Sequence, residues 1–161
     1  KIEYNGQGDA IRGNLLKMLD SSEELIASFF KDSSYPVQSI YDALCNAVVH
    51  RDYWDMTREI VVTIDSHKIE ISNPGSIWIG GSIKKLMEDQ NPPRRNPWLY
   101  QRLLLIDQKE RFLKYGLGMK RIKKPFKNIG RVKIFNFPNK NLFKIVLPGE
   151  AIFQLHKNYS I

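Results

Sequence analysis

The chain has 161 residues, of which 42% are hydrophobic and 11% aromatic, so it can form one globular domain with a core. Its formal net charge is +8, from 25 basic and 17 acidic residues, which makes polyanions the favoured class of partner. A single cysteine, Cys45, excludes an internal disulfide, and we interpret it as a small buried hydrophobe. The sequence has no Cys/His cluster typical of zinc sites and no apolar run near the roughly 20 residues of a membrane span.

The ends of the chain predict its context. It begins at Lys1 rather than Met and carries no signal peptide, so we expect a fragment of a longer, cytoplasmic, bacterial protein that does not enter a membrane. Residues 1–149 are expected to form one domain, and residues 150–161 a C-terminal tail that docks or frays.

An amphipathic helix is the first element that the sequence predicts. Apolar residues recur at helical spacing over residues 9–30 and define one stripe. A polar loop follows, and Pro36 stands just inside a second helix that extends to about Tyr53. Two segments then alternate between apolar and polar residues and predict a β-hairpin, with strands over 59–65 and 68–73.

The second half of the chain predicts further helices and another hairpin. Residues 76–95 are expected to be irregular apart from a short helix after Ser82. Asn96-Pro97 is typical of a helix N-cap followed by proline at the first helical position, and predicts a helix through Ile106. The remaining predicted elements are a helix over 118–128 and two strands, over 131–137 and 142–147, joined by a turn at 138–141.

One face of the second helix carries three polar residues. Asp42, Asn46 and His50 are four residues apart, so a helix stacks them on one side. A carboxylate, an amide and an imidazole on a largely apolar helix are costly to bury without partners, so such a stripe usually lines something polar. A hydrated Mg²⁺ with a phosphate is one candidate, because Mg²⁺ takes oxygen ligands and keeps several waters. A solvated helix face without a ligand is the alternative.

Two glycine-containing turns lie further along the chain. Asn73-Pro-Gly75 ends the first hairpin, and Gly116-x-Gly118 precedes a basic helix start. Glycines at a helix N-terminus allow close approach of the backbone, and free N–H groups there attract anions. Taken alone, a Gly-x-Gly is more often a simple turn.

These motifs occur in a specific order along the chain. The order resembles the ATP-binding domain shared by DNA gyrase B subunits, MutL, the heat-shock chaperone ATPases and histidine kinases, which is the GHKL or Bergerat fold. It is similar in particular to the C-terminal domain of RecG-related transcriptional regulators and ATP-dependent DNA helicase-like proteins. The motifs are Asp42-Ala-Leu-Cys-Asn46-Ala-Val-Val-His50-Arg-Asp-Tyr53, Ile69-Glu-Ile-Ser-Asn73-Pro-Gly75, Arg95-Asn-Pro97 and Gly116-Leu-Gly118-Met-Lys-Arg121-Ile122.

The resemblance covers about residues 8–149 and implies a fold. That fold is an α/β two-layer sandwich of the α+β class, with a Bergerat-like mixed sheet and helices packed on one face. It also implies two cofactors, ATP and Mg²⁺.

The resemblance further implies roles for individual residues. Asn46 matches the asparagine that holds Mg²⁺, and Asp42 matches the glutamate that polarises the attacking water. Asn73 stands where an aspartate binds the adenine amino group. Gly75 follows that position, and Gly116 and Gly118 match the glycines at the end of the ATP lid, near the phosphates; by analogy, residues 76–95 belong to that lid.

Two further candidates come from residue chemistry and spacing. Arg94 or Arg95 suits bidentate contact with a phosphate. His50, one helical turn after Asn46, orients the Asn46 amide or caps a neighbouring carbonyl.

Three departures from the family pattern bear on turnover. Asp42 is one methylene shorter than glutamate, and a general base must come within about 3 Å of the water that it activates. We therefore expect nucleotide binding with weak or lost ATPase activity. Asn73 is an amide rather than an acid, although it can still accept a hydrogen bond from the adenine N6–H. Leu113 stands where the RecG-like branch tends to carry a glutamate.

Three functions remain open from the sequence. The first is the ATP-binding domain of a transcriptional regulator, and the second is a degenerate, nucleotide-free module for interaction or homodimerisation. The third is a domain that contacts DNA through a basic face, for which an ordinary solvated surface is the plain alternative. We see no aromatic-interleaved platform for single strands and no helix-turn-helix. The basic clusters are Lys84, Lys85, Arg94 and Arg95 near the lid, and Lys114, Lys120, Arg121, Lys123, Lys124 and Lys127 around the glycines.

Overall fold

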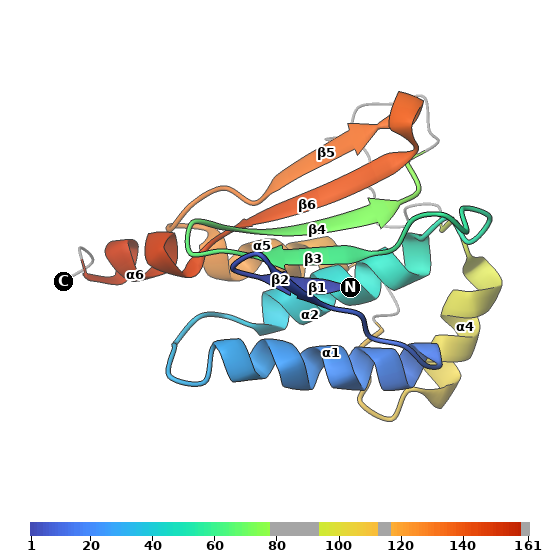
Figure 1. Ribbon diagram of the computed structural model, residues 1–161, viewed down its shortest axis with the longest axis horizontal. Helices are drawn as coiled ribbons and strands as arrows, with labels where there is room; N and C mark the ends of the chain where they lie inside the picture. The colour runs from blue at the N-terminus through green and yellow to red at the C-terminus, as the bar shows by residue number, and fades with distance from the viewer. Residues whose placement is uncertain (78–93, 113–116, 159–161) are drawn as a thin grey trace.

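The described chain, residues 1–77, 94–112 and 117–158, folds into a sheet and a layer of helices in the computed structural model (Figure 1). The strands are β1 (Ile2–Tyr4), β2 (Gln7–Asp9), β3 (Val61–Ile64), β4 (Lys68–Pro74), β5 (Lys133–Phe137) and β6 (Leu142–Pro148). The α-helices are α1 (Leu15–Phe29), α2 (Gln38–His50), α4 (Pro97–Ile106), α5 (Gly118–Lys123) and α6 (Glu150–Asn158). Two 3₁₀ turns, η1 (Lys124–Phe126) and η2 (Pro138–Lys140), complete the set.

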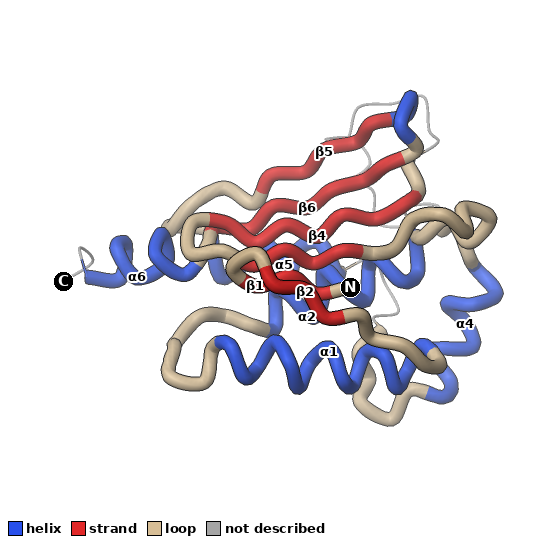
Figure 2. Tube along the Cα trace, in the orientation of Figure 1, coloured by secondary structure: helices blue, strands red, loops and turns tan. Residues whose placement is uncertain are grey.

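The six strands form one mixed sheet in the order β2-β1-β3-β4-β6-β5. Only the pairing of β1 with β3 is parallel, and the other four pairings in the described chain are antiparallel. Helices α1 and α2 lie on one side of this sheet, as Figure 2 shows by colour. The fold is therefore α+β, with a mixed sheet and helices packed on it, and both predicted hairpins belong to that sheet.

The face of the sheet that meets the helices is apolar. Ile69 and Ile71 on β4 are buried, whereas Glu70 between them is only half-buried. Ile145 on β6 lies directly opposite Ile71 and is also buried, so the same face continues across the sheet. Helix α2 fits against this face because residues such as Ala43 are small and fully buried. The alternation of the strands thus determines which side the helices cover.

The N-terminal segment differs from the prediction. The first helix starts at Leu15 rather than residue 9, because the Asn14 side chain accepts a hydrogen bond from Lys17 N at 3.0 Å and caps it there. The residues before it form the β1–β2 hairpin. Asn5 and Gly6 make its turn with φ of 48° and 83°, and Asn-Gly is the commonest signal for such a turn.

Two C-terminal boundaries also differ. The helix predicted over 118–128 ends at Lys123 and tightens into η1, because Pro125 lacks the N–H that a continuing α-helix requires. The predicted tail contains α6, which packs Phe153 against the core. Helix α4 begins at Pro97 as predicted. The short helix expected after Ser82 falls outside the described residues.

Candidate functional site

The predicted polar face of α2 lines a cavity. Asp42, Asn46 and His50 all contribute to the wall of a space of about 100 Å³. The lining also includes Tyr100 of α4 and Gly118 at the start of α5. Two segments far apart in sequence, the helix with Asn46 and the second glycine of the Gly-x-Gly turn, therefore line the same space. Gly116 lies outside the described residues.

Asp42 is buried and both of its carboxylate oxygens are engaged. Gln38 donates from Nε2 to Oδ1 at 3.0 Å, one helical turn earlier. Arg121, from α5, approaches Oδ2 with its Nε at 3.0 Å. Burial raises the pKa of Asp42, and the hydrogen bond from Gln38 and the charge of Arg121 oppose that rise. The carboxylate that matches the family's base is thus held by two protein donors.

Asn46 and His50 are half-buried in the same wall. The Asn46 amide makes no hydrogen bond with any residue that the structure describes. Burial is the main cause that lowers the pKa of His50 to about 4, and the nearby positive charges of Arg94 and Arg95 contribute to the same shift. The imidazole is therefore neutral at pH 7, which suits a positioning role better than that of a charged ligand.

Asn73 lies on the helix-facing side of β4, in line with Ile69 and Ile71. It is 1% exposed, and within the described chain neither Oδ1 nor Nδ2 has a hydrogen-bond partner. A buried amide left unpaired costs about 1–3 kcal/mol, so this side chain is a candidate to bind a ligand or a water. Asn73 is on the same side of the sheet as α2 but does not line the cavity of Asp42.

Gly75 has a structural requirement for glycine. Its φ is +123°, and an added Cβ would lie 2.9 Å from the backbone N of Asp52 and 3.0 Å from the carbonyl O of His50. The same contact region contains a hydrogen bond of 2.7 Å from Asp52 N to Pro74 O. The glycine therefore lets the end of β4 approach the end of α2. Gly118 differs, because an added Cβ there meets nothing within 4 Å.

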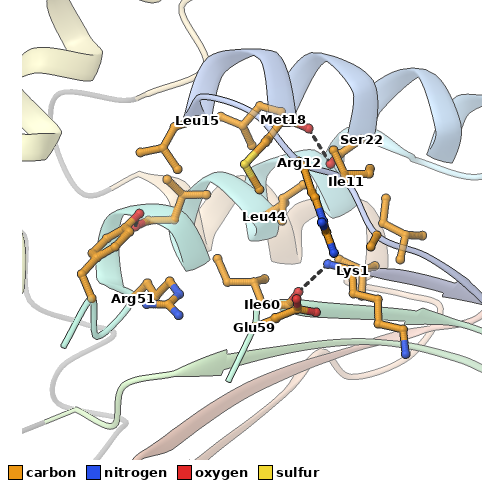
Figure 3. A pocket seen from close by; sticks show the side chains of 16 residues that line it. Lys1, Ile11, Arg12, Leu15, Met18, Ser22, Leu44, Arg51, Glu59 and Ile60 are labelled. Carbon is orange, nitrogen blue, oxygen red and sulfur yellow. Dashed lines mark hydrogen bonds between the residues drawn. The ribbon is translucent and has the colours of Figure 1, made fainter. Parts of the chain in front are cut away.

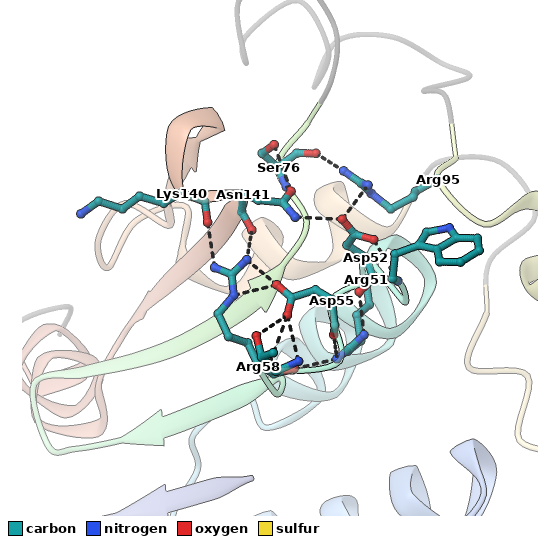
Figure 4. A network of polar contacts seen from close by, with 10 residues as sticks. Arg51, Asp52, Asp55, Arg58, Ser76, Arg95, Lys140 and Asn141 are labelled. Carbon is teal, nitrogen blue, oxygen red and sulfur yellow. Dashed lines mark hydrogen bonds and ion pairs between the residues drawn. The ribbon is translucent and has the colours of Figure 1, made fainter.

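A polar network connects this contact to the rest of the sheet (Figure 4). Asn141 donates from Nδ2 to Asp52 at 2.8 Å, and its Oδ1 accepts from Ser76 N at 3.0 Å. Arg95 lies 3.5 Å from Asp52 and also donates to the Ser76 carbonyl. The guanidinium predicted for phosphate contact is thus bound within the protein, and its neighbour Arg94 lines the cavity instead.

Asn96 has a different role from the one predicted. It precedes α4, but its side chain does not cap that helix. Its Nδ2 donates to the carbonyls of Val49 and Arg51, at 2.8 Å each. Asn96 therefore satisfies carbonyl groups at the end of α2. These hydrogen bonds hold the segment that carries Arg94 and Arg95 against α2.

A second, larger cavity lies between α1 and the strand pair β1–β3 (Figure 3). It has a volume of about 250 Å³ and is mostly apolar, with Met18, Leu44 and Ile60 among its lining residues. Arg51 also lines it, but its guanidinium donates to the carbonyls of Asp52, Asp55 and Arg58. None of the predicted site residues lies here, and no pattern in the sequence indicated it.

Two further properties concern the described residues only. They contain no group of three or more His, Cys, Asp and Glu side chains placed to hold a metal ion. No helix among them is both long and apolar enough to cross a membrane.

Comparisons with known proteins add information on the fold. No family model matches the chain, and neither does any curated protein. Among solved structures, the DIP2311 protein from Corynebacterium diphtheriae is similar, with a TM-score of 0.74 at 18% sequence identity. The alignment covers 96% of this chain and 35% of that one, so the chain spans about a third of the length of its structural neighbour.

Proposed function

We propose that this chain is a GHKL-like, ATP-binding domain of a cytoplasmic bacterial transcriptional regulator related to RecG. One observation carries the proposal: the Asn46 amide lines a cavity between Asp42 and His50, together with Gly118, and has no hydrogen bond to a described residue. That is the position at which the resembled family holds its metal. A half-buried amide without a partner gains most from a ligand.

Asn46 fits the requirements of Mg²⁺. This ion takes oxygen ligands, keeps several waters and is usually held by one or two protein groups together with substrate phosphates. Asn46 would supply one such oxygen, and the bound ion would offset the negative charge of the phosphates. Asp42 is a poorer ligand in this arrangement, because Gln38 and Arg121 occupy its oxygens.

Charge around the cavity favours an anionic ligand. Arg94 lines it, and Arg121 balances the negative charge of Asp42 through their ion pair. The neutral state of His50 adds no positive charge but keeps its ring available for hydrogen bonding. Asn73, buried with an unpaired amide, is the residue that we assign to the adenine base.

We propose binding with slow or no hydrolysis. A base must reach the attacking water, and the Asp42 carboxylate is both short and held by two donors. Nucleotide then acts in this domain as a bound effector rather than as a rapidly consumed substrate.

Calorimetric titration of the purified chain with Mg·ATP tests the proposal. Wild type should bind, and Asn46→Ala should abolish binding without changing the unfolding transition. Asn128→Ala, an exposed amide outside the cavity, is the matched control and should bind as wild type does. No binding at millimolar Mg·ATP would overturn the proposal in favour of a nucleotide-free interaction module. Analytical sedimentation would then test whether that module forms a homodimer.

A further inference from the structure

The open face of the sheet carries exposed aromatic side chains at its β5 edge. Phe135 and Phe137 are 39% and 38% exposed, and their rings stack with centroids 6.1 Å apart and an angle of 9° between their planes. In the register of β5 and β6, Ile134 pairs with the buried Ile145, so the phenylalanines point to the other face, away from the helices. The sequence alone predicted no aromatic platform of this kind.

Positive charge surrounds these rings. Residues 111–149 contain eleven Lys and Arg and no Asp or Glu, although the whole chain has 17 acidic residues. Three exposed cations lie along this part of the chain: Arg131 before β5, Lys133 at its first position and Lys140 after it. Their side chains form no ion pair with a described residue. Lys144, opposite Phe135, is already paired with Glu70 at 2.9 Å. Three cations are thus available beside two stacked rings.

We propose that single-stranded DNA binds along this edge, on a surface that we call the β5 strip and define by Arg131, Lys133, Phe135, Phe137 and Lys140. Unpaired bases stack on aromatic rings, and the cations beside the rings contact the phosphates. A duplex keeps its bases stacked on each other and cannot use the rings. None of the five side chains offers an acceptor for the proton of a 2′-hydroxyl, and rings and cations bind the bases and phosphates that DNA and RNA share, so nothing in the strip requires the RNA sugar.

This inference is independent of the proposed nucleotide site. The β5 strip lies on the face of the sheet opposite the helices, whereas the Asn46 cavity lies among the helices. DNA binding is therefore measured without ATP or Mg²⁺, and its failure leaves the nucleotide proposal standing. The competing explanation is that charged side chains on an edge strand only prevent sheet-to-sheet association.

Fluorescence anisotropy of the full chain with a labelled oligothymidylate of about 12 nucleotides provides the test. Phe135→Leu and Phe137→Leu keep an apolar side chain but remove the ring, and each should weaken binding by about fivefold or more, the lower limit for one stacked base. Trp98→Leu is the control, because Trp98 is 66% exposed on α4, away from the strip, and its loss should have no effect.

Salt dependence tests the cations separately. Three phosphate contacts to a single strand predict a slope of log affinity against log salt of about −2, and Lys133→Gln should reduce its magnitude by about 0.7. Lys31→Gln, an exposed lysine after α1, should leave the slope unchanged. No binding, equal binding by duplex DNA, tighter binding by oligouridylate, or no effect of the Phe substitutions would each overturn the proposal. Aggregation of Lys133→Gln without any DNA binding would support the edge-protection explanation instead.

Discussion

Arg121 and Asp42 are joined by an ion pair of 3.0 Å between Nε and Oδ2, which links α5 to α2. The two residues are 79 positions apart in the sequence and belong to different motifs. The Arg121 side chain is 39% exposed, whereas that of Asp42 is 5% exposed, so the arginine reaches inward from the surface. The contact controls both the charge of the candidate site and the freedom of its carboxylate.

Removal of this arginine should change the titration of Asp42. Burial raises the pKa of the Asp42 carboxyl, and Arg121 is one of the groups that hold it down. Arg121→Gln should therefore raise the pKa of Asp42 further, as followed by carboxyl ¹³C NMR. Lys120→Gln, one residue earlier and exposed, should leave it unchanged. An unchanged titration in Arg121→Gln would mean that the ion pair does not persist in solution.

The half-buried His50 should make stability depend on pH. The pKa of His50 is about 4 in the folded chain, against 6.5 for an ordinary histidine, so only the unfolded chain gains a proton between these values. Stability from neutral His50 is therefore complete above pH 6.5 and is lost as the pH falls toward 4. The 2.5-unit difference corresponds to at most about 3 kcal/mol.

Urea unfolding at pH 7 and pH 4.5 measures this loss. His50→Gln should lose less stability than wild type over the same interval, since glutamine does not titrate. His67→Gln, at an exposed histidine in the β3–β4 turn, should behave like wild type. The same loss in all three proteins would show that other groups cause the acid sensitivity.

The two glycines of the site should respond in opposite ways to a methyl group. Gly75→Ala should destabilise the chain by about 1–3 kcal/mol from backbone strain, since φ is +123°. Steric contact adds to this loss, because the new Cβ would meet backbone atoms at 2.9 and 3.0 Å. Gly118→Ala should be neutral or stabilising by up to about 1 kcal/mol, because alanine favours the helix and its Cβ meets nothing within 4 Å.

Denaturant unfolding of the two variants gives both values under the same conditions. Mg·ATP titration of Gly118→Ala then separates stability from binding. A stable variant with weakened binding would indicate that a ligand, and not the protein, requires the glycine. Equal destabilisation by both substitutions would contradict the packing described for Gly75.

The turn between β5 and β6 should stabilise the end of α2 through one side chain. Asn141 bridges Asp52 and Ser76, and its own φ is +43°. Asn141→Gly accepts that φ but removes both hydrogen bonds, so it should cost about 1–3 kcal/mol. Asn141→Ala should cost more, because alanine is also strained at positive φ.

Asn139→Gly, at an exposed position of the same turn, is the control for the added chain flexibility. Thermal unfolding of the three variants compares them directly. A smaller loss in Asn141→Ala than in Asn141→Gly would contradict the strain expected for alanine at this φ, and would assign the extra loss in glycine to chain flexibility.

Features that depend on local periodicity could be predicted from the sequence. Two-residue alternation over β3–β4 and β5–β6 was sufficient for both hairpins, because one face of each strand is less exposed than the other. Four-residue spacing was sufficient to place Asp42, Asn46 and His50 in one wall of a cavity. The Asn5-Gly6 turn is an equally local signal. It would have predicted the β1–β2 hairpin, which was missed because the first helix was expected to begin at residue 9.

Contacts between side chains of different elements could not be predicted from the sequence, because they depend on tertiary packing. The parallel pairing of β1 with β3, the approach of Arg121 to Asp42 and the bonding of Arg95 to Asp52 all join segments more than 40 residues apart. Phe135 and Phe137 had the alternation of any half-buried strand, and their exposure follows from the helices packing on the other face. Such contacts depend on how layers dock, since the period of a strand or helix specifies its faces but not what each face will meet.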